Sequence, residues 1–372
     1  MKKLFLILCM LSLNSFAINY VDNENFKEQI IFSATGDGKI IVDSNSDVVF
    51  PIASLTKVMN VLVVLDEVEK GNFSLDDKIT FDKETAYISG GRLFALPGDS
   101  YTLRDLLKME LVHSSNNSAY AVAKFIGKGS IENFVNKMNL KAKEIGLKNT
   151  EFASPAGLPP RLSHLNGMDV SSAKDLYLLT SYALKNYNIL EYSNIKEIKL
   201  DGNIYENRNT LLGKYGILGL KTGYHSKSGY NFIVVSKMGD TEIISISLNS
   251  ENIKDRNLVN ERILKILEQN ITTLVDKNNE YYIFDIANHK DKNIEGYLKE
   301  DIKVLDVYKD IKYNLVQLDY KDKDIKKDDK IAILEVYEGS EKLFEKDIFA
   351  VKENKRLKWY ERILRIITFG YY

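Results

Sequence analysis

A serine three positions before a lysine is the first feature of this sequence that could do chemistry. Ser54 and Lys57 lie in the largely apolar stretch "PIASLTKVMN". A hydroxyl becomes a nucleophile at neutral pH when a base stands beside it, and residues three apart share one face of a helix. Lysine is a useful base once burial or a second cation lowers its pKa. Because Pro51 precedes a run with helical spacing, we expect Ser54 at a helix N-terminus, where backbone N–H groups can stabilise an oxyanion.

Two further motifs follow in the order that such a site needs. The stretch "HSSNNSA", residues 113–119, contains Ser-x-Asn, which offers a hydroxyl to pass a proton and an amide to hold a peptide. The stretch "GLKTGYHSKSGYNFIVV", residues 219–235, contains the only Lys-Thr-Gly of the chain. That motif offers a cation and a hydroxyl for a carboxylate, and its glycine allows close backbone approach. The Ser-x-x-Lys spacing alone is weak evidence, because it recurs at Ser171 and Ser193.

Together the three motifs form the signature of penicillin-binding proteins and class A β-lactamases. The chain resembles the low-molecular-mass penicillin-binding proteins, which are D-alanyl-D-alanine carboxypeptidases of the serine peptidase family S11. The resemblance covers most of residues 28–260 and is carried by "PIASLTKVM", "LPGDSYTLRDLLKMELVHSSNNSAYAVAKFIG", "FVNKMNLKAKEIGLKNTEFASPAGL" and "GLKTGYHSKSGYNFIVVS". In the family an alanine-rich helix follows the motif asparagine. This selects Ser114 and Asn116 as the Ser-x-Asn pair, rather than Ser115 and Asn117.

The resemblance implies a catalytic role for each matched residue. Ser54 attacks the carbonyl between the last two D-alanines of a peptidoglycan stem peptide, and Lys57 takes its proton. Ser114 and Lys221 relay a proton to the leaving amine, while Asn116 orients the substrate amide. Water then releases the acyl-enzyme, and neither a metal nor an organic cofactor is needed. β-Lactams are expected to acylate Ser54 as covalent inhibitors.

The resemblance also implies how the substrate is bound. Lys221 and Thr222 hold its terminal carboxylate, Gly223 permits the close approach, and the backbone N–H groups of Ser54 and Tyr224 form the oxyanion hole. The segment "LNSENIKDR" lacks glycines that are often found there in the family, and Arg256 within it is a candidate for additional carboxylate binding.

Two side chains depart mildly from the family pattern. Asn117 stands where aspartate is frequent, and Ser154 stands in "FASPAGL" where asparagine is common.

Three other functions share part of this pattern. A D,D-endopeptidase acting on peptidoglycan crosslinks has the same motifs and stays an alternative. A class A β-lactamase needs a deacylating glutamate, typically in an E-x-x-L-N stretch between the second and third motifs, and the sequence has none there. A non-catalytic wall-binding module would not need the intact Ser/Lys/Ser/Asn/Lys set.

Other kinds of site are not supported by the sequence. The four histidines lack metal-ligand spacing, and neither H-E-x-x-H nor G-x-S-x-G occurs. A formal net charge of −1 argues against a general nucleic-acid binder, which would carry a basic surplus.

The N-terminus predicts export. In "MKKLFLILCMLSLNSFA" two lysines precede an apolar run from Leu4 to Leu13, and a small-x-small site ends at Ala17. This pattern is typical of a cleaved signal peptide over residues 1–17. The run is too short to span ~30 Å of hydrocarbon as an anchor. Cys9 is the only cysteine, so the mature chain would have none. We expect the protein at the outer face of the bacterial cytoplasmic membrane, in cell-wall biogenesis and cell shape.

The rest of the chain predicts the elements that position the motifs. Two apolar stretches flank Thr35–Gly38 as a hairpin, and "YNFIVVSKMG" and "TEIISISLN" flank a second turn at Gly239. Helical periodicity recurs over 54–71, from Thr102, from Asn116, and over 131–146, 172–186 and 254–268. This order predicts an α/β (α+β) fold with an antiparallel sheet covered by helices, as in β-lactamases and transpeptidases, over residues 18–273.

Two further regions follow the peptidase domain. Residues 274–350 alternate apolar and charged residues, which predicts a small β-rich domain with a hairpin turn at 338–340. Residues 351–372 carry six basic residues and two glutamates. Read as a helix, residues 355–372 have one apolar face that includes Leu357, Tyr360 and Leu364. We expect a basic amphipathic segment that makes peripheral membrane contact; a helix packed on the β domain is the alternative.

Overall fold

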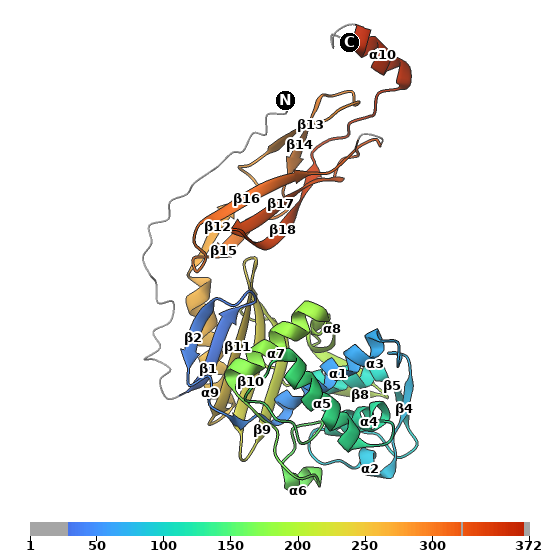
Figure 1. Cartoon of the computed structure of the whole chain (residues 1–372), viewed down its shortest axis with the longest axis vertical. Helices are drawn as coiled ribbons and strands as arrows, with labels where there is room; N and C mark the ends of the chain where they lie inside the picture. Colours follow the sequence, from blue (N-terminus) through green and yellow to red (C-terminus); the bar gives the residue numbers. More distant parts are fainter. Residues whose placement is uncertain (1–28, 321–322, 368–372) are drawn as a thin grey trace. The chain divides into compact units, whose positions relative to one another are not determined.

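The computed structural model describes residues 29–320 and 323–367. They form two compact units, each with its own sheet (Figure 1). The N-terminal unit comprises residues 29–238 and 242–269, and the C-terminal unit comprises the turn 239–241 and the chain from 270 onward. The predicted signal peptide, and the end of the predicted membrane segment from residue 368, lie outside the described residues.

A five-stranded antiparallel sheet forms the centre of the N-terminal unit, with the strand order β2-β1-β11-β10-β9. Its strands are β1 (Ile30–Thr35), β2 (Ile40–Ser44), β9 (Ile217–His225), β10 (Gly229–Met238) and β11 (Thr241–Ser250). The two predicted hairpins are therefore confirmed. Strand β9, which carries Lys-Thr-Gly, is an edge strand of the sheet.

Helices cover both faces of this sheet. Phe232 and Ile233 are neighbours on β10 and therefore point to opposite faces, yet both are fully buried. Phe232 lies under Arg256 of α9 (Ile253–Glu268), whereas Ile233 belongs to the main core with Val58 and Leu62 of α1 (Lys57–Glu69). The predicted architecture is confirmed.

The remaining helices of this unit surround the motifs. They are η2 (Ala53–Thr56), α2 (Lys83–Ala86), α3 (Leu103–Val112), α4 (Asn116–Ile126), α5 (Ile131–Ile145), α6 (Pro160–Ser163), α7 (Ala173–Asn186) and α8 (Leu190–Ser193). Helices α3, α4, α5 and α7 begin at side-chain caps, in which Thr102, Ser115, Ser130 and Ser172 accept from a backbone N–H three residues later. These polar caps explain why the helices begin where the sequence predicts.

Short strands complete the unit in three pairs. They are β3 (Phe50–Pro51) with β6 (Val170–Ser171), β4 (Lys78–Thr80) with β5 (Ser100–Thr102), and β7 (Glu197–Leu200) with β8 (Asn203–Glu206). Pro51 lies in the two-residue strand β3, just before η2. So short a strand tolerates a proline, which has no N–H to donate.

The C-terminal unit is a β-structure with its own core. Its strands are β12 (Ile271–Val275), β13 (Tyr282–Asp285), β14 (Asn293–Tyr297), β15 (Ile302–Leu305), β16 (Ile311–Gln317), β17 (Lys330–Glu338) and β18 (Glu341–Ala350). Strands β12 and β15 pair with each other, and the others form a sheet of order β13-β14-β18-β17-β16. The predicted turn at 338–340 connects β17 to β18, and Gly339 there has a φ of 58°. Alternate residues of β17, namely Ala332, Leu334 and Val336, are fully buried in this core together with Ile348 of β18.

The last described element is α10 (Trp359–Ile367), which begins later than expected. Leu357, expected on the apolar face of the helix, is instead buried in the β-structure, where its N–H donates to Asn288 O. Arg365 fixes α10 to this unit through hydrogen bonds to the carbonyls of His289 and Lys290. The apolar side chains of α10 remain exposed, at Trp359, Tyr360, Ile363, Leu364, Ile366 and Ile367.

Across the described ranges, we find no helix with the length and apolar character required to cross a membrane.

Candidate active site

The backbone around Ser54 is held by two glycines from distant parts of the chain. Ser54 lies in η2, one turn before α1, and Ala53 before it has a φ of 50°, which is uncommon for a residue with a side chain. A Cβ on Gly157 would lie 1.8 Å from Ala53 O, and a Cβ on Gly223 would lie 3.2 Å from Ser54 N. Only glycine lets both segments approach this turn, so Lys-Thr-Gly lies directly beside the serine.

Lys57 is a basic side chain in hydrogen-bond contact with Ser54. Its Nζ is 3.0 Å from Ser54 Oγ, 2.7 Å from Asn116 Oδ1 and 3.0 Å from Ala156 O, so all three donors have acceptors. The side chain is fully buried. Burial lowers the pKa of Lys57 from 10.5 to about 7, against the opposing influence of Glu110 and Asp169. A substantial fraction of Lys57 is therefore neutral near pH 7 and able to accept a proton.

The structure distinguishes the two registers of Ser-x-Asn. Asn116 meets Lys57 through Oδ1 and donates from Nδ2 to Ser89 O (2.7 Å). Ser115 instead caps α4, and Asn117 binds both backbone groups of Leu93. Ser115 and Asn117 thus hold the loop before α3, while Asn116 is the member that reaches Lys57. Asn117, one of the departures from the family pattern, therefore stabilises this loop through its hydrogen bonds to Leu93.

Ser114 lies at the turn between α3 and α4. It is half-buried and has a φ of 63°, a left-handed conformation that is rare for serine. A Cβ on Gly91 would lie 3.1 Å from Ser114 O, so the loop containing Gly91 packs tightly against this turn. The strained conformation is maintained by the packing of two segments.

Lys221 is the second buried lysine of the site. It is 1% exposed, and its Nζ donates to Thr222 O (2.8 Å). Burial lowers its pKa well below the ordinary value, and nearby Lys57 and Arg208 lower it further. The site without substrate therefore disfavours a charge on Lys221, and an incoming carboxylate would reverse this effect.

Tyr224 and Arg256 flank the end of β9. Tyr224 is 56% exposed, and its ring stacks on Tyr230 with centroids 4.2 Å apart. Arg256 is nearly buried, lies 4.8 Å from the centre of the Phe232 ring, and donates to Asn257 Oδ1. Its positive charge is close enough to act on Lys221. The structure thus brings Arg256 into the electrostatic environment of the site.

Three features of the site were missed by the sequence reasoning. Two are backbone acceptors, Ala156 O for Lys57 and Ser89 O for Asn116. The third is Asp169, which is fully buried and accepts from Ser154 Oγ (2.7 Å) and from two backbone N–H groups. Burial raises the pKa of Asp169 to about 6. Gly157 in "SPAGL" could have pointed to the Ala156 acceptor, because a glycine there allows the backbone to approach the serine turn closely.

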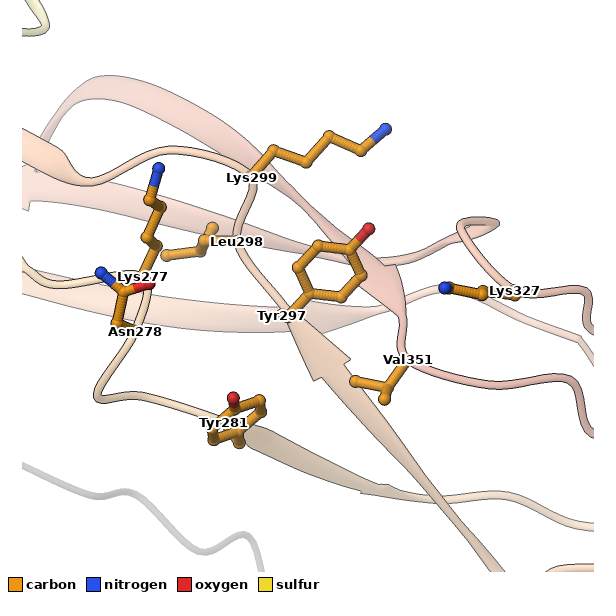
Figure 2. A pocket seen from close by; sticks show the side chains of 8 residues that line it. All are labelled: Lys277, Asn278, Tyr281, Tyr297, Leu298, Lys299, Lys327 and Val351. Carbon is orange, nitrogen blue, oxygen red and sulfur yellow. The ribbon is translucent and has the colours of Figure 1, made fainter.

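A surface groove lies in the C-terminal unit. It is a shallow groove of about 520 Å³, lined by Lys277, Asn278, Tyr281, Tyr297, Leu298, Lys299, Lys327 and Val351 (Figure 2). None of the predicted site residues lines it. In the described part of the chain, no group of three or more His, Cys, Asp and Glu side chains is arranged to hold a metal ion.

Comparisons with known proteins agree on one family. Residues 24–252 match the family described as D-alanyl-D-alanine carboxypeptidase, Peptidase S11. DacF, a D-alanyl-D-alanine carboxypeptidase of Bacillus subtilis, is 30% identical over 331 residues, which is 86% of this chain and 83% of that protein.

Solved structures give the same result for the fold. Penicillin-binding protein D2 of Listeria monocytogenes, in its ampicillin-bound form, is 30% identical with a TM-score of 0.57 over 63% of this chain and 95% of that one. The carboxypeptidase DacD of Francisella tularensis has a TM-score of 0.62 at 22% identity over 88% of this chain and 94% of that one.

Proposed function

This chain belongs to the D-alanyl-D-alanine carboxypeptidase family, peptidase S11, and is a serine-type enzyme of that class; from this premise we propose that it works through an acyl-enzyme on Ser54. The observation that carries the proposal is the 3.0 Å contact between Ser54 Oγ and a buried lysine with a pKa of about 7. Covalent catalysis requires a nucleophile within hydrogen-bond distance of a base. The substrate is a peptidoglycan stem peptide that ends in D-Ala-D-Ala.

In the acylation step, neutral Lys57 takes the proton of Ser54 while Oγ bonds to the carbonyl carbon of the penultimate D-alanine. The backbone N–H groups of Ser54 and Tyr224 hold the negative oxygen of the tetrahedral intermediate. The carbon–nitrogen bond then breaks, and the amine of the leaving D-alanine receives a proton through Ser114. Asn116 keeps Lys57 directed at Ser54, which its 2.7 Å contact supports, and orients the substrate amide.

The substrate carboxylate is held at the end of β9. Lys221 and Thr222 bind it, and Arg256 adds positive charge from α9. The buried basic groups of Lys221 and Arg256 lack a carboxylate partner within hydrogen-bond distance among the described residues. The substrate carboxylate supplies the negative charge that favours the protonated form of Lys221 and matches that of Arg256. A peptide without a free C-terminus would leave this charge uncompensated, which explains a preference for a terminal residue.

In the deacylation step, water attacks the ester carbon and Lys57 again acts as base. The ester carbon–oxygen bond breaks, Ser54 Oγ recovers a proton, and the shortened stem peptide leaves. The proposed chemistry needs one water molecule per turnover and otherwise uses side-chain and backbone groups of the chain itself.

The decisive experiment is incubation of the mature protein with a D-Ala-D-Ala-ended peptide, followed by measurement of free D-alanine. We expect release by the wild type and none by Ser54→Ala. A crosslinked dimer peptide, tested in parallel, separates the carboxypeptidase from the D,D-endopeptidase activity. Cleavage of the crosslink alone would contradict the proposed preference.

β-Lactams are proposed to acylate the same serine, which the ampicillin-bound structure of the related Listeria protein supports. Intact-mass spectrometry should show one penicillin adduct on the wild type. An adduct of equal yield on Ser54→Ala would contradict the assignment of the nucleophile.

We further propose that the protein is exported and bound to the outer face of the cytoplasmic membrane through α10. Trp359, Ile363, Ile366 and Ile367 follow the spacing of one helical face and are 48–76% exposed. Such a helix lies in the interface rather than across the bilayer, and its basic residues add ~1 kcal/mol each near anionic lipid. On this view residues 18–273 are the peptidase domain, and residues 274–350 are a β domain that lies between it and the membrane segment in the sequence.

Flotation with anionic liposomes tests the anchor. The mature protein should float at low salt, whereas a chain ending at Glu353 should stay in the soluble fraction. Ile366→Ser with Ile367→Ser is the sharper variant, because it removes exposed apolar area and keeps the Arg365 hydrogen bonds to the β unit. Equal flotation of this double variant and the wild type would contradict insertion of the apolar face.

A further inference from the structure

The N-terminal unit buries a carboxyl group that none of the three motifs explains. Glu110 lies on α3, four residues before Ser114, and is fully buried. Neither of its carboxyl oxygens has a hydrogen-bond partner among the described residues. Its neighbours on the same helix face, Leu106 and Leu107, are apolar and buried. An ionised carboxylate in such a place is strongly disfavoured unless other charges compensate it.

Two lysines face Glu110 from the elements that pack on α3. Helix α3 packs on α1, which begins at Lys57, and on β9, which carries Lys221. Both lysines are buried and act electrostatically on Glu110. The other charged groups that face this cluster are Asp169 toward Lys57, and Arg208 and Arg256 toward Lys221. Glu110 is therefore an acidic group that, when ionised, acts on both lysines.

The interaction acts in both directions. Burial raises the pKa of Glu110 well above the ordinary value, and Lys57 and Lys221 oppose this. Conversely, Glu110 is the largest influence that raises the pKa of Lys57 against burial. The protonation of the carboxyl group and that of the base are thus linked, because each charged form favours the other.

We propose that Glu110 is a positioning residue whose ionised form interacts electrostatically with the two buried active-site lysines and so sets the pH at which Lys57 becomes a base. The inference rests on the proposed role of Lys57 as the base for Ser54. Glu110 does not touch Ser54 or the reacting atoms in this scheme, and it acts through Lys57 and Lys221.

The test is Glu110→Gln, which keeps the size of the side chain and removes its charge. Loss of the anion should lower the midpoint of the Lys57 titration by about one pH unit. The midpoint can be measured by NMR on protein labelled with ¹³C at the lysine ε-carbon, with Lys57→Arg identifying the signal. The acid limb of the acylation rate with a fluorescent penicillin should move to lower pH by the same amount.

Glu67→Gln is the matched control. Glu67 lies on α1, the helix that begins with Lys57, and is 8% exposed, but it is ion-paired with Lys137 at 3.0 Å. Its replacement should leave the Lys57 midpoint unchanged. Glu110→Asp keeps the charge but withdraws it by one methylene, so its midpoint should fall between those of the wild type and Glu110→Gln.

Failure of the Glu110 proposal can be distinguished from failure of the proposed function. A folded Glu110→Gln variant with the wild-type midpoint would overturn the role of Glu110, since the NMR titration does not depend on acylation. Failure of the wild type to be acylated would instead contradict the proposed function. If Glu110→Gln does not fold, Glu110→Asp decides: a lowered midpoint supports the proposal and an unchanged one contradicts it.

Discussion

The N-terminal unit buries Lys57 and Lys221 almost completely, whereas the C-terminal unit leaves three lysines exposed around a shallow groove (Figure 2). The groove lysines are Lys277, Lys299 and Lys327, and in the described part of the chain no carboxylate lies within ion-pair distance of them. An exposed ammonium group keeps its water shell and acts only as a charge. Burial removes that shell, so the same side chain can lose its proton near neutral pH.

The largest expected effect comes from Lys57→Arg. A guanidinium group stays protonated at every pH of interest, so the variant has no base beside Ser54. The second-order rate of acylation by a fluorescent penicillin should fall by about 10²–10⁴-fold at pH 8. Lys299→Arg, the same exchange in the exposed groove, should leave the rate unchanged. A Lys57→Arg rate within tenfold of the wild type would show that burial has not made Lys57 the base.

The second effect is the pH dependence of acylation by the wild type. In the proposed mechanism the reactive form of Lys57 is the neutral amine, which accumulates above its pKa of about 7. The rate should therefore rise with pH, by roughly a hundredfold from pH 5 to pH 8, and level off above the midpoint. Stopped-flow or quenched-gel measurements across this range give the midpoint. A midpoint near the ordinary lysine value would mean that water reaches the amine.

Lys221→Arg should have a smaller effect, because the positive charge for the substrate carboxylate remains. We expect kcat/KM on a D-Ala-D-Ala peptide to fall by about tenfold, or ~1.4 kcal/mol. Lys221→Ala removes the charge and should lose considerably more. Equal losses in the two variants would indicate that shape at this position matters more than charge.

The smallest expected effect on acylation comes from substituting the lysines of the groove. Replacing Lys277, Lys299 and Lys327 together with alanine should leave the acylation rate within about twofold, as expected for exposed side chains of the other unit, none of which belongs to the candidate site. Thermal unfolding should shift slightly, since Lys299 Nζ lies 3.7 Å from the centre of the Phe349 ring and that contact contributes about 0.5–1 kcal/mol. A tenfold loss of acylation would contradict the functional independence of the two regions.

Much of this arrangement could be predicted from the sequence, because it depends on side-chain types at fixed spacing. Polar caps and turn residues marked the helix starts and hairpins, and the three motifs identified residues that the structure brings together, among them Ser54, Lys57 and Asn116. The family pattern also selected the Ser-x-Asn register in which the asparagine reaches Lys57.

The other features of the site could not be predicted, because they depend on contacts that are not tied to a particular residue type. The carbonyls of Ala156 and Ser89 bind Lys57 and Asn116, yet every residue carries a carbonyl. Glu110 falls in a helix whose pattern places it near leucines, and only the packing of α3 on α1 and β9 shows which charges it faces. The start of α10 was misplaced because Leu357 fits an apolar helix face and a β core equally well.

The burial of Lys57 also affects the folding equilibrium. An unfolded chain would hold the Lys57 proton up to about its ordinary pKa of 10.5, whereas the folded chain releases it near 7. Between these values the unfolded state binds one more proton at this residue, so its contribution to the free energy of unfolding rises with pH across that window. Below pH 7 both states are protonated, and the folded state carries the whole penalty, up to ~5 kcal/mol. The group proposed to make Ser54 reactive is thus a source of native-state instability, greatest on the acid side of neutrality.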